Sequence, residues 1–155
     1  MERYLYNSGI KKIEYYLKRY NLLDLKISKL SEFADDYNYR NGYNKWLKNK
    51  CSSLEEEAIR NIEIEQRIYK IRKWQNLITA ILEHYKAKDK EKYKFICLKY
   101  FKKLTPIKIQ ERMSLTEEEQ DSLKFEILNY IFAVAIKKNM LKEVVCNINA
   151  KENIK

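Results

Sequence analysis

Hydrophobic residues near the N-terminus of the chain recur at helical spacing. The first set lies in a segment from about residue 10 to 20 and comprises Ile13, Tyr16, Leu17 and Tyr20. These four residues have the spacing i, i+3, i+4 and i+7. A second set, in a segment that starts near Asp24, comprises Ile27, Leu30, Phe33 and Ala34. Each set lies on one face of an amphipathic helix, so we expect two helices that form an N-terminal helical hairpin.

This pattern is interrupted between Asp35 and Asn44, where the sequence reads DDYNYRNGYN. Asp, Asn and Gly favour turns and disfavour helix interiors, so the segment is predicted to be a loop that links two parts of the chain. An adhesive surface formed by its Tyr and Arg side chains is the alternative.

A long helix is expected from about Ser53 to Tyr85. Ser53 and Glu56 have the spacing of a capping box, in which each side chain bonds a free backbone N–H group at the start of a helix. A stripe of isoleucine and leucine residues then continues at helical spacing as far as Leu82. The other side of this helix carries a basic cluster, which is either a second anion-binding face or an ordinary solvated surface: Arg67, Lys70, Arg72 and Lys73.

A further helix is expected after Asp89, whose side chain can cap it. Its apolar positions, again at i, i+3, i+4 and i+7, are Tyr93, Ile96, Cys97 and Tyr100. Cys97 is therefore expected to pack as a small hydrophobic residue rather than to act as a reactive thiol.

Two closely spaced helix starts follow. Thr105 is a good N-cap residue and Pro106 suits the first helical position, where its missing N–H group is not needed. Thr116 and Glu119 form a second capping box, after which Leu123, Ile127 and Ile131 continue as a buried stripe. A short capped helix, a tight turn and a second capped helix are typical of a helix-turn-helix arrangement.

The composition agrees with an all-α protein. The chain of 155 residues contains only 2 glycines and 1 proline, too few for many tight hairpins, and is 45% hydrophobic, enough for a core. We expect an N-terminal helical region over residues 1–50, a long helix with the helix-turn-helix-like unit over 51–143, and a flexible tail over 144–155.

The formal net charge of +10 favours a polyanionic partner such as nucleic acid, although an AT-rich genome would also enrich lysine. Cys51, Cys97 and Cys146 are odd in number and lack zinc-ligand spacing, which indicates a reduced setting. No apolar run has the length of a transmembrane helix, and MERYLYNSGI lacks the apolar core of a signal peptide. We therefore expect a soluble, cytoplasmic protein without a membrane partner.

Residues of the C-terminal half form a pattern shared with a known family. They are Tyr100-Phe101, the basic step Lys102-Lys103, Leu104-Thr105, Ile109, Glu111-Arg112-Met113, Leu115-Thr116 and Ile127-Leu128. The region from about Leu54 to Leu141 resembles the RinA/ArpU-type phage transcriptional regulators, whose C-terminal half is similar to region 4 of bacterial sigma factors. The resemblance implies a phage transcription regulator that binds duplex DNA, with residues 117–126 against the bases.

The candidate DNA-binding residues follow from this resemblance. Backbone contacts are expected from four basic residues, Lys102, Lys103, Lys108 and Arg112. The two cap residues, Thr105 and Thr116, are further candidate DNA-binding residues. Base contacts are expected from Gln120, Ser122 and Lys124. However, four of the five residues from 117 to 121 are Glu or Asp, which repel phosphates. Gln110 and Gln120 also replace apolar residues of the family pattern, which is expected to loosen the crossing of the two helices.

Three functions therefore remain open. In the first, the unit binds duplex DNA in spite of its acidic helix start. In the second, the unit contacts a protein, such as RNA polymerase or a second copy of this chain, while DNA binds at the basic cluster from Arg67 to Lys73. The third is a plain helical interaction or inhibitory protein of a mobile element.

Catalysis is not expected. His84, the single histidine, lies near a helix end, where a surface position or a contact with the helix dipole is a better interpretation than a general base. The sequence contains no glycine-rich phosphate loop, no metal-ligand spacing and no nucleophile with an evident base. We therefore expect no metal, no cofactor and no small-molecule substrate.

Overall fold

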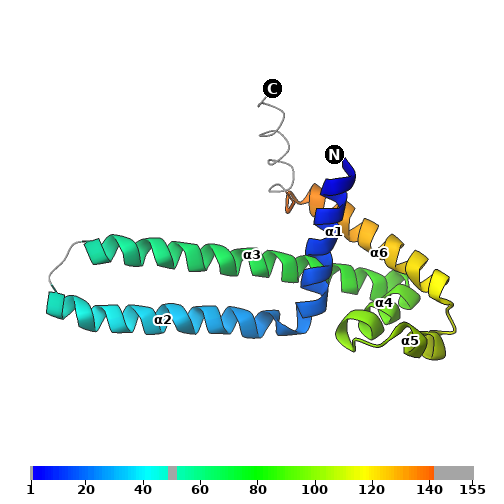
Figure 1. Cartoon of the computed structure of the whole chain (residues 1–155), viewed down its shortest axis with the longest axis horizontal. Helices are drawn as coiled ribbons and strands as arrows, with labels where there is room; N and C mark the ends of the chain where they lie inside the picture. Colours follow the sequence, from blue (N-terminus) through cyan, green and yellow to red (C-terminus); the bar gives the residue numbers. More distant parts are fainter. Residues whose placement is uncertain (1, 49–51, 142–155) are drawn as a thin grey trace, which may run out of the picture. The chain divides into compact units, whose positions relative to one another are not determined.

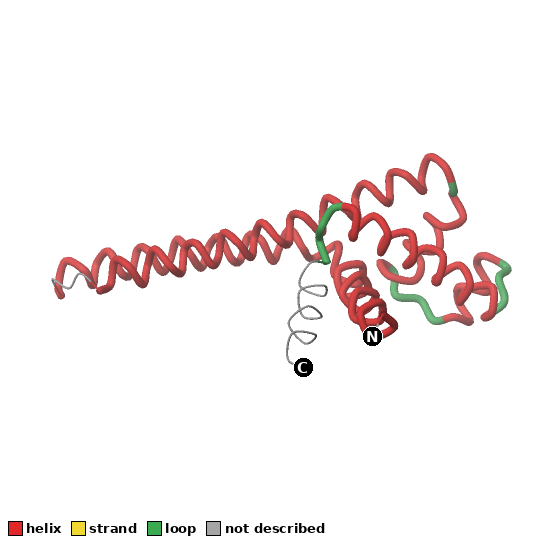
Figure 2. The backbone as a smooth tube through the Cα atoms, turned by 90° about the horizontal axis from the view of Figure 1, so that it is seen from above, coloured by secondary structure: helices red, strands yellow, loops and turns green. Residues whose placement is uncertain are grey.

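The protein is all-α in the residues that the structure, a computed structural model, describes, namely 2–48 and 52–141. The helices are α1 (Glu2–Arg19), α2 (Leu23–Lys48), α3 (Ser52–Lys88), α4 (Lys90–Ile96), α5 (Pro106–Met113) and α6 (Glu117–Lys137). A 3-10 turn, η1 (Tyr20–Leu22), joins α1 to α2, and a π-helical turn, η2 (Cys97–Phe101), follows α4. No β-strand occurs in this part of the chain (Figure 2), so the predicted fold class is confirmed. The predicted tail over 144–155 lies outside the described residues.

The helices divide into two compact units. One unit is Asn21–Asn76, and the other combines Met1–Tyr20 with Leu77–Lys155. We call them the hairpin unit and the terminal unit. Helix α3 contributes its first part to the hairpin unit and its last part to the terminal unit.

The hairpin unit consists of α2 and the first part of α3, which run antiparallel and side by side (Figures 1 and 2). Among the side chains of this pair that the structure describes, the buried ones are Leu23, Ile27, Ile64, Ile71 and Trp74. At one end, the Gln75 side-chain amide donates a hydrogen bond of 2.7 Å to the Asp24 carboxylate. The hairpin unit is thus a helical hairpin, which α2 and the first part of α3 form.

The prediction of a loop at Asp35–Asn44 is wrong, because α2 continues as a helix through this segment to Lys48. The intrinsic preference of Asn, Asp and Gly against a helix amounts to about 1 kcal/mol or less per residue. Such a preference is weak, since tertiary context commonly outweighs it in protein helices.

The terminal unit has its core between α1, the end of α3, α4 with η2, and α6. Its most completely buried side chains include Ile13, Phe95, Tyr100, Ile127 and Ile131. Helix α1 packs against both α6 and η2. At its crossing with α6, Gly9 leaves room for the Phe132 ring, whose edge meets the Tyr6 ring at a centroid distance of 5.2 Å.

The π-helical turn η2 ends α4 and directs the chain toward α5. The Lys102 N–H group donates to the Cys97 carbonyl at 2.9 Å, and the Leu104 N–H group donates to the Leu98 carbonyl at 3.0 Å. Between them, Lys103 has a positive φ of 52°. Asp89 caps α4 as predicted, since its side chain accepts a hydrogen bond of 3.2 Å from the Lys92 N–H group. Cys97 is half-buried at the first position of η2.

The described residues contain no helix that combines the length and the apolar character needed to cross a lipid bilayer.

Candidate functional site: the α5–α6 unit

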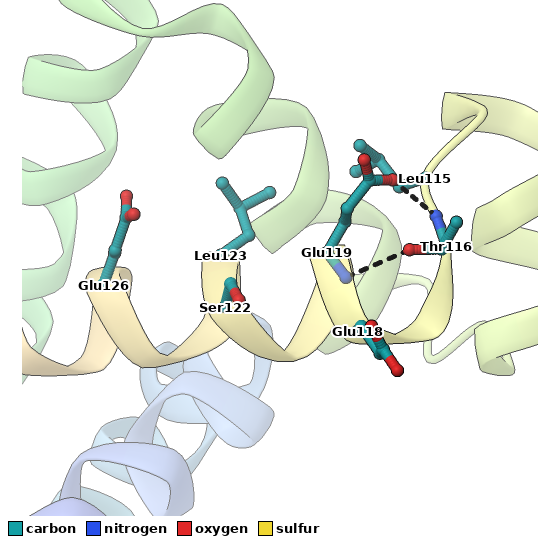
Figure 3. Close-up of a pocket in the computed structure, with 7 residues that line it drawn as sticks. All are labelled: Leu115, Thr116, Glu118, Glu119, Ser122, Leu123 and Glu126. Carbon is teal, nitrogen blue, oxygen red and sulfur yellow. Dashed lines mark hydrogen bonds between the residues drawn. The ribbon is translucent and has the colours of Figure 1, made fainter.

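Both helix starts predicted in the C-terminal half are present, but their caps differ. Thr105 occupies the N-cap position of α5 with Pro106 at the first helical position, yet its hydroxyl makes no capping hydrogen bond. Thr116 and Glu119 form a complete capping box at α6 (Figure 3). The Glu119 N–H group donates to the Thr116 hydroxyl at 3.2 Å, and the Thr116 N–H group donates to the Glu119 carboxylate at 2.8 Å.

The two threonines provide a matched pair for measuring the cap. We expect Thr116→Ala to lower the free energy of unfolding by about 1 kcal/mol, because it leaves a backbone N–H group without its acceptor. Thr105→Ala removes the same atoms from an N-cap that makes no such bond, so it should change the stability by less than about 0.5 kcal/mol. Urea unfolding followed by circular dichroism measures both variants, and equal losses would contradict the assignment of the cap.

Gln120 is a structural residue that ties the turn to α5. Its side chain is only 3% exposed, and its amide nitrogen donates to the Pro106 carbonyl at 3.0 Å and to the Leu115 carbonyl at 3.2 Å. Its amide oxygen is buried and has no hydrogen-bond partner among the described residues. The expected contact between Gln120 and a base is therefore excluded in this structure. Gln120 was also expected to loosen the helix crossing, but its two hydrogen bonds instead tie the turn to the start of α5.

The turn between the helices is closed by a residue in the left-handed conformation. Ser114 ends α5 with a φ of 56°, and its N–H group donates to the Gln110 carbonyl at 2.8 Å. This backbone conformation ends helices, usually at glycine, and it lets the chain reverse toward α6 within three residues.

Lys124, another expected base contact, faces α1 instead. Its ammonium group lies 3.0 Å from the Glu14 carboxylate, which also accepts a hydrogen bond of 3.3 Å from the Tyr100 hydroxyl. Burial, followed by the carboxylate of Glu14, raises the pKa of Tyr100 above its ordinary value, so this hydroxyl stays protonated as a donor. Burial also lowers the pKa of the neighbouring Lys99, with a further contribution from Lys124. Lys124 thus helps to join α6 to α1.

The start of α6 presents a cluster of carboxylates to solvent. Glu117, Glu118 and Asp121 are exposed, whereas the Glu119 carboxylate is occupied by the capping box. An open groove of about 500 Å³ runs along this part of the helix (Figure 3), lined by Leu115, Thr116, Glu118, Glu119, Ser122, Leu123 and Glu126. Of the three side chains expected to reach bases, only Ser122 is well exposed.

Lys92 borders this acidic surface from α4. Its ammonium group lies 3.1 Å from the Glu126 carboxylate and 3.4 Å from the Asp89 carboxylate. The hydrogen bond with Glu126 is the main reason that the pKa of Lys92 is raised. This ion pair connects α4 to α6, and no local sequence pattern could have predicted it because the partners are distant in the sequence.

The expected phosphate contacts outside α6 are all exposed: Lys102, Lys103, Lys108 and Arg112. Lys108 and Arg112 are one turn apart and share one edge of α5, beside the buried Ile109. On the other edge, Gln110 lines a second groove of about 620 Å³ with Ile107, Glu111, Ser114 and Thr116. The basic edge of α5 therefore lies on the side of the helix that faces away from this second groove.

The second basic cluster belongs to the hairpin unit. Arg67, Lys70, Arg72 and Lys73 are exposed on α3, and the Lys73 ammonium group lies 5.6 Å from the centroid of the Tyr69 ring. The structure thus brings the expected contacts of α5 and α6 into one unit and leaves these four residues in the other.

His84 is exposed, and its ring stacks on that of Tyr130 with a centroid distance of 5.2 Å and an interplanar angle of 19°. The neighbouring Tyr85 is buried, and burial is the main reason that its pKa is raised. Within the described residues, no three His, Cys, Asp or Glu side chains gather in a way that could hold a metal ion.

No model of a known protein family, no curated protein and no solved structure matches this chain. The α5–α6 unit therefore has to be interpreted from its own geometry.

Proposed function

We propose that this chain is a transcription regulator that acts by binding a protein, and that the α5–α6 unit contacts a basic surface of that partner. The single observation that carries the proposal is the exposed acidic start of α6. Glu117, Glu118 and Asp121 occupy the turns with which a helix-turn-helix protein reads bases. RNA polymerase is the first candidate partner, because the sequence resembles transcriptional regulators.

Electrostatics supports a basic protein surface over a phosphate backbone at this helix. A carboxylate held near DNA adds repulsion and releases no counterions, whereas the same group attracts Lys and Arg of a protein. Lys124, the basic residue expected to reach bases, faces Glu14 instead, and the neutral Gln120 is buried. Leu115 and Leu123 add apolar area to the acidic groove, which suits a basic amphipathic helix.

The second candidate function is binding of duplex DNA, as the sequence resemblance implies. It is favoured by the four exposed basic residues Lys102, Lys103, Lys108 and Arg112 and by the net charge of +10. In this mode the basic edge of α5 contacts phosphates without base readout by α6. Both functions involve binding rather than catalysis, and both place the protein inside the cell.

Two double variants distinguish these functions. We expect Glu117→Lys with Glu118→Lys to weaken binding to purified RNA polymerase by about tenfold or more, and Lys108→Ala with Arg112→Ala to weaken it by less than about twofold. Both variants leave the Thr116–Glu119 cap in place. Biolayer interferometry at several salt concentrations measures the affinities, with a promoter-containing duplex in parallel.

The opposite result would favour the second function. DNA binding replaces the proposal if the wild-type protein binds the duplex and the double variant Lys108→Ala with Arg112→Ala binds it more weakly. The slope of log K against log salt should then fall by about two in this variant, because two phosphate contacts are lost. If the wild-type protein binds neither the polymerase nor the duplex at low salt, both functions are wrong.

A further inference from the structure

Helix α3 carries two opposite faces with apolar residues in the hairpin unit. One face packs against α2 and contains the buried Ile64 and Ile71. The other face, half a turn away, comprises residues spaced alternately by four and three: Glu55, Ile59, Ile62, Gln66, Tyr69 and Lys73. Such spacing is the a and d pattern of a coiled coil. We call this set the outer seam.

The apolar residues of the outer seam are exposed. Ile59 is 57% exposed, Ile62 53% and Tyr69 62%. A helix that only packs on one side normally carries polar residues on the opposite face, because exposed apolar surface lowers stability and solubility. The α2–α3 pair leaves this face uncovered, so the seam has the form of an interface.

The charges beside the seam divide α3 into two halves. Residues 55–65 contain five glutamates and one arginine, whereas residues 66–76 contain four basic residues and no acidic one. Parallel pairing of two such helices would bring like charges together. Antiparallel pairing brings the acidic half of one helix against the basic half of the other, so the seam is complementary to itself.

We propose that a second copy of this chain packs on the outer seam, with the two α3 helices antiparallel about a two-fold axis near the middle of residues 55–73. Ile59 and Ile62 of one copy then lie near Tyr69 of the other, and Glu55 lies near the basic end at Lys73. A two-fold interface requires a surface that is complementary to itself, and the charges beside this seam meet the requirement. The inference is independent of what α5 and α6 contact.

The first test measures the mass of the full chain in solution. Sedimentation equilibrium at micromolar concentrations should give a dimer for the wild-type protein. Ile62→Ser should weaken dimerisation by about tenfold or more, because it removes a packed isoleucine from the seam of both copies. Ile136→Ser is the matched control, since Ile136 is an exposed isoleucine on α6 at 49%, and it should leave the dimer unchanged.

The second test exchanges the charges of the two halves. One variant carries Glu55→Lys, Glu56→Lys and Glu63→Lys, and the other carries Arg67→Glu, Arg72→Glu and Lys73→Glu. Each variant alone should dimerise more weakly than the wild type, because like charges then face each other. An equimolar mixture should form a heterodimer, which shows that both variants still fold.

A wild-type protein that is still monomeric at 100 µM would overturn the proposal. A dimer that is insensitive both to Ile62→Ser and to the charge exchange would also overturn it, because the second copy would then bind elsewhere. Circular dichroism of each variant distinguishes lost association from lost helix.

Discussion

Gln120→Glu should destabilise the protein by about 3 kcal/mol at pH 7, because it places a carboxylate against two backbone carbonyl oxygens. The Gln120 amide nitrogen donates to both carbonyls, and the side chain is 3% exposed. An ionised Glu offers no donor in return and is removed from water. Only the protonated carboxyl group can donate one hydrogen bond there, so folding should raise its pKa.

The loss should therefore depend on pH. An acid whose pKa is higher in the folded state than in the unfolded state is protonated more in the folded protein, so stability falls as pH rises from the unfolded pKa of about 4.3 toward the folded pKa. Below pH 4 most of the loss should disappear. Urea unfolding at pH 3 to 8, compared with the wild type, measures this dependence.

The control for this substitution is Gln110→Glu, an identical change at an exposed position of α5. It should alter the free energy of unfolding by less than about 0.5 kcal/mol at any of these pH values. If Gln120→Glu is as stable as Gln110→Glu at pH 7, Gln120 is not the residue that joins the turn to α5.

Gly9→Val should destabilise the terminal unit by about 2 to 3 kcal/mol. A Cβ atom at Gly9 would overlap the Phe132 ring and would lie 3.4 Å from the Leu141 side chain. The ring would have to move away from Tyr6, or α1 would have to separate from α6. Thermal unfolding followed by circular dichroism measures the loss.

The matched control is Asn7→Val, because Asn7 is exposed on the same helix. The two substitutions introduce the same β-branched side chain into α1, so the difference between them isolates the crossing with α6. Equal melting temperatures for the two variants would show that α1 and α6 do not meet closely at Gly9.

Local signals in the sequence were sufficient to predict the helices of the α5–α6 unit. Pro106 and the Thr116–Glu119 capping box act within one helical turn, and the structure has helices starting at Pro106 and Glu117. Asp89 was predicted as a cap for the same reason. The prediction failed at Asp35–Asn44, where α2 continues, because the preferences of single residues against a helix are weak.

The roles of individual site residues could not be predicted in the same way. Gln120 was identified as a departure from the family pattern, but its two acceptors depend on how the turn folds back on α5. Lys124 was expected to face DNA, whereas its partner Glu14 lies on another helix far away in the sequence. Contacts between distant segments leave no periodic signal in a single sequence.

The carboxylates that begin α6 have an effect on the helix itself. Each of them lies near the positive end of the helix dipole, where a negative charge contributes about 0.3 to 1 kcal/mol to stability. Exchanging them for lysine would remove this contribution and replace it with repulsion. Folding and attraction to a polyanion thus place opposite demands on Glu117 and Glu118. A substitution at these positions that raises the affinity for a polyanion should lower the stability of α6.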